Sequence, residues 1–591
     1  MRKLIVGALA VIGGLSILFV LLVFVIGVSM RSSTGTVPSK TILEANLETG
    51  LVEDVPDDAV AKTLLSGSPV VRDIVDALDR GSRDDRVAGL VLRLGGSSMG
   101  MAQAQEIRDA VRSFRARKKF AVAFAETFGE FGPGGSSYYV ATACDQIWLQ
   151  PSGDIGLTGI VMESQFLRGG LDKLGAVPRM DHRYEYKSAM NVYTEKKYTA
   201  PHREANEAVM KSWFGQMVRG IAEGRKIPEE QVRALVDRGP FLGQEAVDAK
   251  LVDGLAYRDD VYAKVKQKAG ADAELLYLGR YLDRAGRPHA SGKTIALIYG
   301  AGAVQRGHSG FDPIFGSTSM GSDTVAAAFR AAVKSPSVKA ILFRVDSPGG
   351  SYVASDTIWR ETVKARQAGK PVIVSMGNLA GSGGYFVAMA ADKIVAQPGT
   401  ITGSIGVLGG KVLTPGAWAK IGISWDEVHK GKNATLWSSN SDYTPEGWKR
   451  LEAWLDRVYA DFTNKVAEGR KLPKARVLEI AKGRIWTGED AKRLGLVDEL
   501  GGFPAAMALA RKAARIPEKE EVRIEVFPRK KTTFEALMDQ LSGRQRESSE
   551  SSASTAVLMR TLELIQPVAR QVRGAAGARG VLSMPEFTTV H

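Results

Sequence analysis

The segment that decides the fold runs from Val372 to Val407 and reads VIVSMGNLAGSGGYFVAMAADKIVAQPGTITGSIGV. Its first residues, Val372–Met376, predict a β-strand because they are rich in β-branched side chains. A run of small residues follows, and it places one hydroxyl, that of Ser382, among glycines. A helix is expected over Tyr385–Ala391, and a second short apolar strand over Ile394–Ala396. Strand, glycine turn and helix in this order predict an α/β fold with a serine at the turn.

The setting of Ser382 suits reaction chemistry. Glycine on both sides lets the backbone approach a bound carbonyl group without a side chain in the way. A serine just before a helix also lies beside unpaired N–H groups, which stabilise a developing negative charge. An isolated Gly-Ser-Gly is more often a simple helix N-cap, so the rest of the chain has to decide between the two readings.

The amino-acid composition limits which kinds of protein the chain can be. The chain has 591 residues, 44% apolar and 24% charged, which suggests several ordinary globular domains. The net charge of +14 is spread along the chain without a basic stripe, so we expect no nucleic-acid binding. The single cysteine, Cys144, lies in a predicted helix and excludes an intramolecular disulfide, and the six histidines have no metal-ligand spacing. We therefore expect no metal and no cofactor.

The N-terminus predicts a membrane anchor. Leu4–Val28 contains no charged residue and is long enough to span a bilayer with some tilt. Arg2 and Lys3 precede it, Arg31 follows it, and no convincing signal-peptidase site is present. We expect residues 1–30 to form an uncleaved signal anchor in a bacterial inner membrane. The body of the protein would then lie on the periplasmic side.

The remainder of the chain is a tandem repeat. Offsets between matching segments drift slowly, as duplication followed by loop changes leaves them. The matches are Lys40–Ile42 with Lys293–Ile295 (offset 253), Val87–Leu94 with Val338–Val345 (251), Tyr138–Ala141 with Tyr385–Ala388 (247), and Glu223–Pro228 with Glu468–Pro473 (245). We expect one repeat over 40–290, a second over 293–530, and a tail over 531–591 that contains a serine-rich linker, Glu547–Ser554, expected to be disordered.

Each repeat alternates strands with helices. In the second repeat a strand is expected over Ala340–Val345 and a helix over Val353–Gln367, before the segment quoted above. Such alternation with short glycine-rich connections favours a mainly parallel sheet with helices around it.

The serine needs a base, and a histidine is a poor match for that role. Ala380 stands where the serine-hydrolase elbow has its first glycine, although His429 stays open as a partner. A neutral lysine can also activate a serine, provided that burial lowers its pKa. Lys187 and Lys432 occupy equivalent places in the two repeats, at an offset of 245.

Lys187 is the better candidate of the two lysines. Tyr184 and Tyr186 flank it and give it a partly apolar setting, whereas Lys432 lies in a polar segment, His429–Asn433, typical of a solvated loop. The first repeat has Gly135 where the second has Ser382, although Ser136 and Ser137 leave another alignment open. A lysine in the first repeat would then serve the serine of the second.

The motifs together resemble the long form of signal peptide peptidase A, also called protease IV. The resemblance covers about Leu4 to about Arg529. Its motifs are Asp346–Ser351 (DSPGGS), Ala380–Tyr385 (AGSGGY), Thr402–Gly406 (TGSIG) and Tyr186–Ala189 (YKSA). One small departure is Ala-Gly-Ser in place of the Ala-Ala-Ser that is frequent in the family.

The resemblance implies a Clp/crotonase-like fold in each repeat and a Ser-Lys dyad shared between the repeats. Ser382 would be the nucleophile, Lys187 the general base, and Ser404 would orient the lysine amine. The oxyanion hole would consist of the N–H of Gly383 and that of a glycine in the Ser-Pro-Gly-Gly turn. Gly350 is preferred for this second donor, and Gly349 is the alternative.

The family also implies a substrate class and an assembly. We expect a membrane-anchored serine endopeptidase that degrades apolar peptides, above all cleaved signal peptides, and that forms a ring-like homotetramer. Two alternatives remain from the residues alone. A crotonase-like acyl-CoA enzyme would use the same oxyanion glycines on a thioester, and a catalytically inactive scaffold would use none of these groups.

Overall fold

The computed structural model describes residues 35–65, 67–96, 99–313, 315–529, 581–583 and 589–590. The predicted anchor, Leu4–Val28, and the serine-rich linker lie outside the described residues. Within the described ranges, no helix combines the length and the apolar character needed to cross a bilayer.

The first repeat is built on a six-stranded parallel sheet in the order β10-β1-β2-β3-β4-β9. Helices α3 (Val71–Ser82) and α4 (Met101–Ala116) pack together beside it, and buried apolar side chains of the sheet and helices form one core. The strands are β1 (Thr41–Asn46), β2 (Val87–Leu94), β3 (Phe120–Ala125), β4 (Gln146–Leu149), β9 (Gly254–Leu255) and β10 (Glu274–Tyr277). The central strands β2 and β3 are almost completely buried on both faces, which explains why their sequences are almost continuously apolar.

The second repeat has an equivalent sheet in the order β21-β19-β17-β15-β11-β23, with β18 (Lys393–Ala396) also paired to β17. All of its pairs are parallel except β19 with β21. The strands are β11 (Lys293–Ala301), β15 (Val338–Ser347), β17 (Val372–Gly381), β19 (Ile401–Gly403), β21 (Ile485–Thr487) and β23 (Val522–Phe527). The predicted mainly parallel α/β architecture is confirmed.

Several boundaries differ from those expected. Helix α14 (Tyr352–Gln367) matches its prediction within one residue, but β17 continues to Gly381, five residues beyond Met376. Helix α15 (Gly383–Ala388) consequently begins and ends earlier than expected. The predicted helix around Cys144 was wrong, since α5 (Gly135–Ala141) ends three residues before this buried cysteine.

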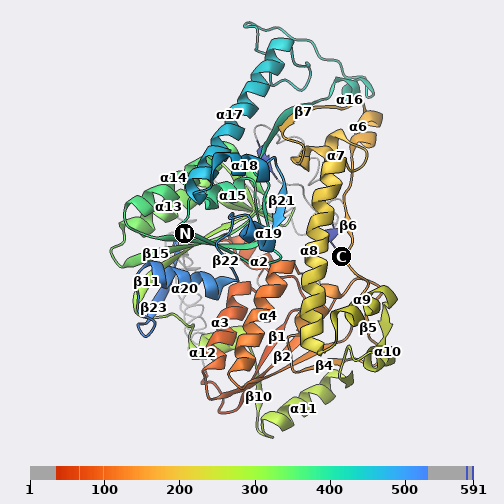
Figure 1. Ribbon diagram of the computed structural model, residues 1–591, viewed down its shortest axis with the longest axis vertical. Helices are drawn as coiled ribbons and strands as arrows, with labels where there is room; N and C mark the ends of the chain where they lie inside the picture. Colours follow the sequence, from red (N-terminus) through yellow and green to blue (C-terminus); the bar gives the residue numbers. More distant parts are fainter. Residues whose placement is uncertain are drawn as a thin grey trace, which may run out of the picture.

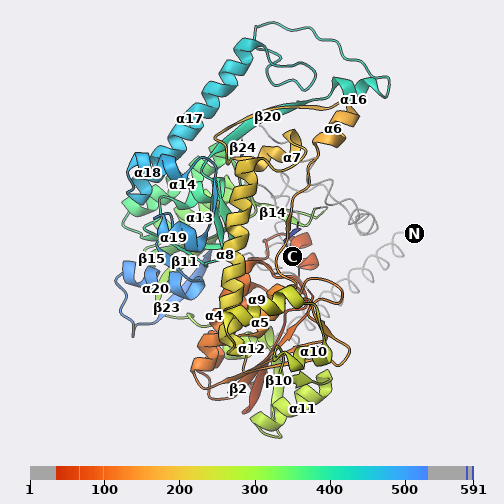
Figure 2. The ribbon, with the colours of Figure 1, turned by 45° about the vertical axis from the view of Figure 1, so that its right-hand side comes forward.

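Two long helices show how closely the repeats correspond. Helix α8 (Ala200–Arg225) and helix α17 (Pro445–Arg470) each contain 26 residues and start 245 positions apart. Each begins after a threonine N-cap and ends at a lysine in the left-handed conformation. In both views α8 rises from the first repeat alongside the second (Figures 1 and 2).

A third sheet joins the two repeats, in the order β13-β14-β12-β16-β24-β20-β7. Strand β7 (Val177–Arg183) comes from the first repeat and pairs antiparallel with β20 (Val407–Leu413) of the second over its whole length. The other members are β12 (Ala303–Gln305), β13 (Gly310–Asp312), β14 (Ser317–Gly321), β16 (Gly349–Ser351) and β24 (Val581–Ser583). This pairing carries the segment after β7 onto the second repeat.

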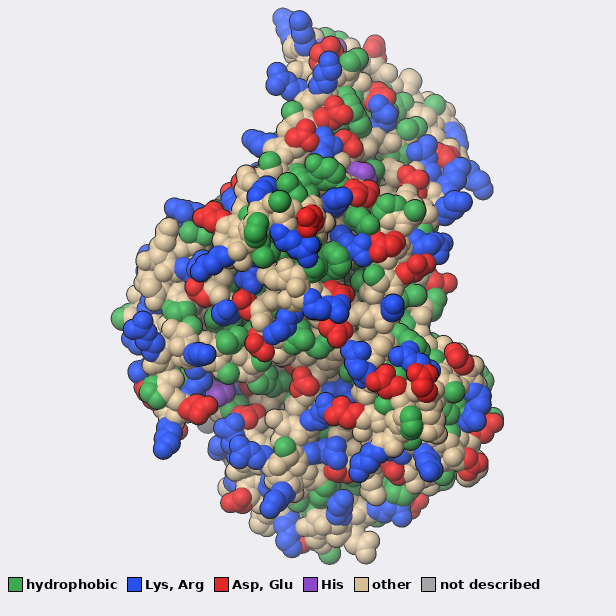
Figure 3. All heavy atoms as spheres, viewed as in Figure 1, with side chains coloured by type: hydrophobic (Ala, Val, Ile, Leu, Met, Phe, Trp, Pro, Cys, Tyr) green, Lys and Arg blue, Asp and Glu red, His purple; other side chains and the backbone are tan. Residues whose placement is uncertain are grey.

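Charged side chains of both signs are mixed on the surface. On the face drawn in Figure 3, basic and acidic side chains are interspersed over both repeats. That face carries no continuous basic stripe of the kind that tracks a phosphate backbone.

Candidate active site

Ser382 stands at the sharp turn between β17 and α15. Its φ of 55° and ψ of −115° are rare for a residue with a side chain, and its side chain is fully buried. The N–H of Ser382 donates to the carbonyl oxygen of Gly403 at 2.8 Å, and its own carbonyl oxygen accepts from the N–H of Phe386 at 2.8 Å. Backbone strain of this kind persists only where the surroundings fix it, and it is common at reactive residues.

Lys187 reaches this turn from the first repeat. It follows β7, and its Nζ lies 2.7 Å from Ser382 Oγ, 2.9 Å from Ser404 Oγ and 3.0 Å from Ser404 O. All three side chains are completely buried. Burial disfavours the ammonium form, so the pKa of Lys187 lies well below its ordinary value.

These three contacts suit a neutral amine. A neutral amine has two N–H donors and one lone pair. The two donors can satisfy the hydroxyl and the carbonyl oxygen of Ser404, which leaves the lone pair to accept the hydroxyl proton of Ser382. The arrangement can therefore remove a proton from Ser382 without a histidine.

The loop that buries Lys187 belongs to the second repeat. A Cβ added to Gly483 would lie 2.5 Å from Lys187 Cβ, so the backbone of this loop presses directly on the lysine stem. The N–H of Tyr186 donates to Lys482 O at 3.2 Å and fixes the two segments together. The flanking Tyr184, in contrast, is nearly half exposed and rests on Tyr459.

The other sequence candidates lie elsewhere. Lys432 and His429 fall within a segment that is exposed throughout, and His429 faces Glu427 at 3.3 Å rather than Ser382. In the first repeat, Tyr138 donates its hydroxyl to Leu251 O at 2.7 Å, as Tyr385 does to Leu496 O at 2.8 Å. These matched contacts favour the alignment at offset 247, in which Gly135 faces Ser382.

The Ser-Pro-Gly-Gly turn lies against the serine turn. A Cβ on Gly383 would lie 2.7 Å from Ser355 Oγ and 2.9 Å from Gly350 N, so only glycine fits there. Gly383 is the first residue of α15, and its N–H therefore has no acceptor within the helix. The N–H of Gly349 donates to Ser347 Oγ at 3.2 Å, which makes Gly350 the better second donor to an oxyanion.

A bulge sets the position of the serine. Strand pairing between β15 and β17 is regular up to Val345 and Met376 and resumes at Ser347 and Ala380, so three residues of β17 face Asp346 alone. Asp346 Oδ1 accepts the N–H of Leu379 at 2.8 Å. The carboxylate replaces the strand partner that the bulged residue lacks.

Residues of the first repeat contact Asn378, which lies in the same bulge. Asn378 Oδ1 accepts the N–H of Gln103, near the start of α4, at 3.0 Å. A Cβ on Gly100, the N-cap of that helix, would lie 2.2 Å from the Asn378 side chain. The strand that leads to Ser382 is thus registered against the repeat that carries Lys187.

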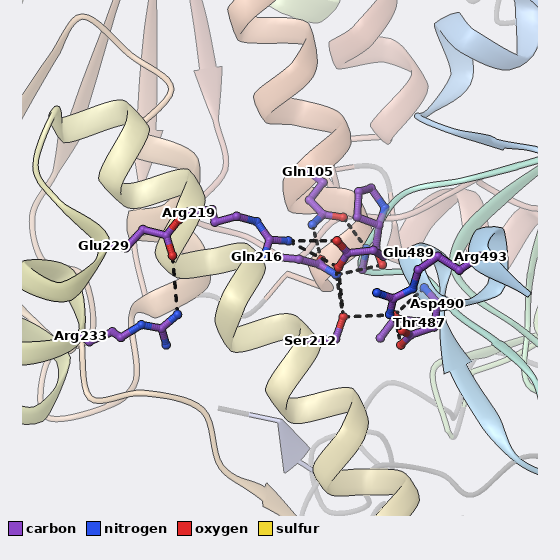
Figure 4. A network of polar contacts seen from close by, with 12 residues as sticks. Gln105, Ser212, Gln216, Arg219, Glu229, Arg233, Thr487, Glu489, Asp490 and Arg493 are labelled. Atoms are coloured by element: carbon purple, nitrogen blue, oxygen red, sulfur yellow. Dashed lines mark hydrogen bonds and ion pairs between the residues drawn. The ribbon is translucent and has the colours of Figure 1, made fainter.

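Further polar contacts keep the two repeats in register (Figure 4). Gln105 of α4 accepts the N–H of Gly399 at 2.7 Å and donates to Gln216 of α8 at 2.7 Å. Gln216 in turn donates to Glu489 of the second repeat at 3.1 Å. Deeper in the interface, buried Arg344 of β15 contacts two carboxylates of the first repeat, Glu53 at 2.9 Å and Glu106 at 2.8 Å.

A slot for one extended chain runs past the glycine turn. Strands β16 and β20 do not pair with each other; β24 lies between them, antiparallel to both. Leu582 pairs with Gly350 and Val581 with Leu408. A peptide bound in this place would have its main chain beside the candidate oxyanion donor.

The chain is similar to known proteins over most of its length. The profile of "Peptidase family S49" matches residues 114–272 and 364–517, one stretch in each repeat. Protease 4 of Salmonella typhi is 32% identical over 562 residues, covering 90% of this chain and 88% of the relative. Serine protease SPPA from the chloroplast of Arabidopsis thaliana is 31% identical over 473 residues (78% and 68%), and Protease 4 of Haemophilus influenzae is 30% identical over 541 residues (86% and 84%).

The chain is a serine protease. Within that class it belongs to peptidase family S49, and the resemblance stated from its motifs is confirmed. Among solved structures, a point mutant of ClpP1 from Listeria monocytogenes aligns with 36% of this chain and 94% of its own, at 12% identity and a TM-score of 0.23. The Clp/crotonase-like assignment of each repeat stays a prediction.

Proposed function

We propose that the protein is a membrane-anchored endopeptidase that uses a Ser382–Lys187 dyad to degrade apolar peptides, with cleaved signal peptides as the main substrates. The observation that carries the proposal is the 2.7 Å contact between Lys187 Nζ and Ser382 Oγ, in a site where both side chains are fully buried. A buried lysine without a carboxylate partner has no evident structural use, whereas a neutral one is a base.

The reaction follows from the contacts. Neutral Lys187 accepts the hydroxyl proton while Ser382 Oγ attacks the peptide carbonyl carbon. The N–H groups of Gly383 and Gly350 stabilise the oxyanion, and Ser404 holds the amine in line. The lysine then gives its proton to the leaving amine, and water hydrolyses the acyl-enzyme by the same route.

The slot between β16 and β20, which the chain's own β24 fills in this structure, supports a peptide substrate that would take the place of that strand. Main-chain pairing on both sides binds an extended chain largely without regard to sequence, which suits the degradation of varied apolar peptides. An acyl-CoA thioester has no strand to offer such a slot, and the alternative enzyme would leave Lys187 without a role.

A serine-directed fluorophosphonate tests the dyad. We expect the detergent-solubilised chain to be labelled at Ser382, and we expect Ser382→Ala to abolish labelling. Labelling of Ser382→Ala at the wild-type rate would refute the assignment of the nucleophile, and a labelling rate that Lys187→Met leaves unchanged would refute that of the base.

The cellular setting is part of the same proposal. Residues 4–28 anchor the chain in the inner membrane, and the repeats lie on the periplasmic side. Protease added to intact spheroplasts is then expected to digest the repeats. Protection of the body until the membrane is broken would reverse this topology. We also propose that four copies assemble into a ring, which sedimentation of the solubilised chain tests.

A further inference from the structure

A loop of the second repeat, residues 481–484 between α18 (Lys474–Ile480) and β21, separates Lys187 from an open cavity. On its inner side, Gly483 packs against the lysine stem. On its outer side, residues 481, 482 and 484 line a cavity of about 320 Å³ together with Tyr186 and Trp486. This space is large enough for several water molecules, each of which takes about 30 Å³. The position of the loop therefore controls the access of water to the lysine from this side.

The backbone of the loop also contacts the segment that orients the amine. The N–H of Ser404 donates to Arg484 O at 2.7 Å, and the N–H of Gly483 donates to Ile405 O at 2.8 Å. Lys482 has a φ of 55°, in the left-handed region that is uncommon for a residue with a side chain. Such a conformation persists only where the surroundings hold it. The loop therefore needs contacts that fix it in place.

The side chain of Arg484 supplies these contacts. Its guanidinium group lies over two aromatic rings, 4.9 Å from the centroid of Tyr186 and 4.4 Å from that of Trp486. Nη1 and Nη2 both donate to the carboxylate of Glu204 in α8, Nη2 at 2.7 Å. The hydrogen bond from Arg484 is the main reason why the pKa of Glu204 lies below its ordinary value. Arginine can stack and bind a carboxylate with two nitrogens at once, so it fastens the loop to the residue beside Lys187 and to the first repeat.

The equivalent loop of the first repeat lacks this arginine. The offset of 245 that relates α8 to α17 aligns Arg484 with Gly239 and Glu204 with Lys449. The equivalent loop also covers no lysine, since Lys432 is exposed. The arginine and its carboxylate partner thus occur in the copy of the junction where a lysine is buried against a serine.

Burial lowers the pKa of the Lys187 amine well below the ordinary lysine value. The amine contacts two uncharged side chains, Ser382 at the turn after β17 and Ser404 after β19. Water that reaches the amine is therefore expected to raise its pKa toward the ordinary value. The charged side chains of the surrounding segments are paired with one another, Glu185 with Lys482 at 3.2 Å and Arg484 with Glu204 at 2.7 Å.

We propose that Arg484 is a positioning residue for the base: by fastening the loop 481–484 to Tyr186 and to α8, it keeps water away from the amine of Lys187 and holds that amine in line with Ser382. Arg484 acts through the loop and does not touch the reacting atoms. This inference rests on the Ser382–Lys187 dyad proposed above and adds a residue that controls it.

The dependence of turnover on pH tests this role in the detergent-solubilised full chain. Arg484→Met keeps an apolar side chain on the loop but removes the guanidinium group from Tyr186 and Glu204. We expect the acidic limb of kcat/KM on an apolar peptide to move up by about 1 to 2 pH units, because complete burial shifts a lysine pKa by about 3 to 5 units and the variant loses part of that burial. Below the limb kcat/KM is then expected to fall about 10- to 100-fold, and above it to return to within about three-fold of wild type.

Two further variants complete the test. Arg476→Met is the matched control, since Arg476 lines the same cavity but pairs with Glu479 of its own helix at 2.8 Å. We expect it to leave the limb in place. Glu204→Gln removes only the charge that faces Arg484, and we expect it to move the limb up by about 0.5 pH units. This milder change keeps the test decisive if Arg484→Met does not fold.

The outcomes separate this inference from the dyad itself. A limb that neither Arg484→Met nor Glu204→Gln moves, or a loss of activity that is equal at every pH, would overturn the role of Arg484 alone. A wild-type profile without an acidic limb would refute Lys187 as the base, and this inference with it. The rate at which a fluorophosphonate labels Ser382, measured against pH, is expected to show the same shift in Arg484→Met, and an unshifted labelling profile would also overturn the role of Arg484.

Discussion

Replacing Lys187 with methionine separates the chemistry of the amine from the space that its side chain fills. Methionine keeps an unbranched stem in the fully buried site but removes the group that contacts Ser382 Oγ at 2.7 Å. General-base catalysis contributes about 100- to 10,000-fold, and losing the base also leaves the nucleophile unactivated. We expect kcat/KM on an apolar fluorogenic peptide to fall by about 1,000-fold or more, with the fold retained.

Lys432→Met is the matched control, since Lys432 is the equivalent residue of the second repeat and is exposed. We expect it to keep near-normal turnover. If Lys187→Met retained more than about a tenth of the wild-type activity, or if Lys432→Met lost as much, the shared dyad would be wrong. The wild-type profile of kcat/KM against pH should also show an acidic limb, because protonation of Lys187 removes the base.

The same variant has a distinct signature in stability. The pKa of Lys187 is depressed in the folded protein, so between that value and the ordinary lysine value the unfolded chain binds more protons than the folded one. In this window the wild-type free energy of unfolding rises with pH, by up to about 1.4 kcal/mol per pH unit from this group. We expect Lys187→Met to lose that slope in urea melts between pH 7 and 10; equal slopes in the two proteins would refute a neutral buried lysine.

Three further substitutions probe the surroundings of the dyad, and a fourth is a control. Ser404→Ala removes the 2.9 Å contact to Lys187 Nζ but keeps the carbonyl contact, so we expect kcat to fall about 10- to 100-fold with KM little changed in steady-state assays. Gly383→Ala places a Cβ 2.9 Å from Gly350 N, and we expect a loss of about 100- to 1,000-fold in kcat with the protein still folded by circular dichroism. Asp346→Ala removes the carboxylate that accepts the N–H of Leu379 in the bulge, and we expect it to lower kcat at least about 10-fold. Asp392→Ala is the control, since Asp392 accepts the N–H of Val372 at 2.8 Å at the other end of β17, and we expect it to change stability but not kcat. Equal effects of the two substitutions on kcat would contradict a special role for the bulge.

Local patterns in the sequence were enough to locate the two glycine-rich turns of the candidate site. Glycines around Ser382 and in the Ser-Pro-Gly-Gly turn are required by close backbone contacts, and such requirements act within a few residues. The offsets between repeats made Lys187 and Lys432 equivalent, and Gly135 in place of a serine in the first repeat then favoured Lys187 as the partner of Ser382. The apolar setting expected from the flanking tyrosines differs from the structure, because Tyr184 is nearly half exposed and the loop at Gly483 covers the lysine stem.

Contacts between distant segments could not be predicted from the same patterns. The extension of β17 beyond Met376 depends on Asp346 and on Gln103, which is 275 residues from its partner Asn378. A glycine-rich run also has weak local preference, so its neighbours decide whether it continues a strand or turns. The Arg344 cluster is a similar case, since its two carboxylates come from the other repeat.

The division of the dyad between two repeats has a consequence for biosynthesis. Lys187 and Ser382 are 195 residues apart, and the ribosome completes the lysine-bearing half first. A nascent or prematurely terminated chain that ends before the second repeat contains the proposed base but not the proposed nucleophile. A released second repeat contains the proposed nucleophile without its base. If the proposed dyad is right, proteolytic competence arises only when both halves have folded and docked.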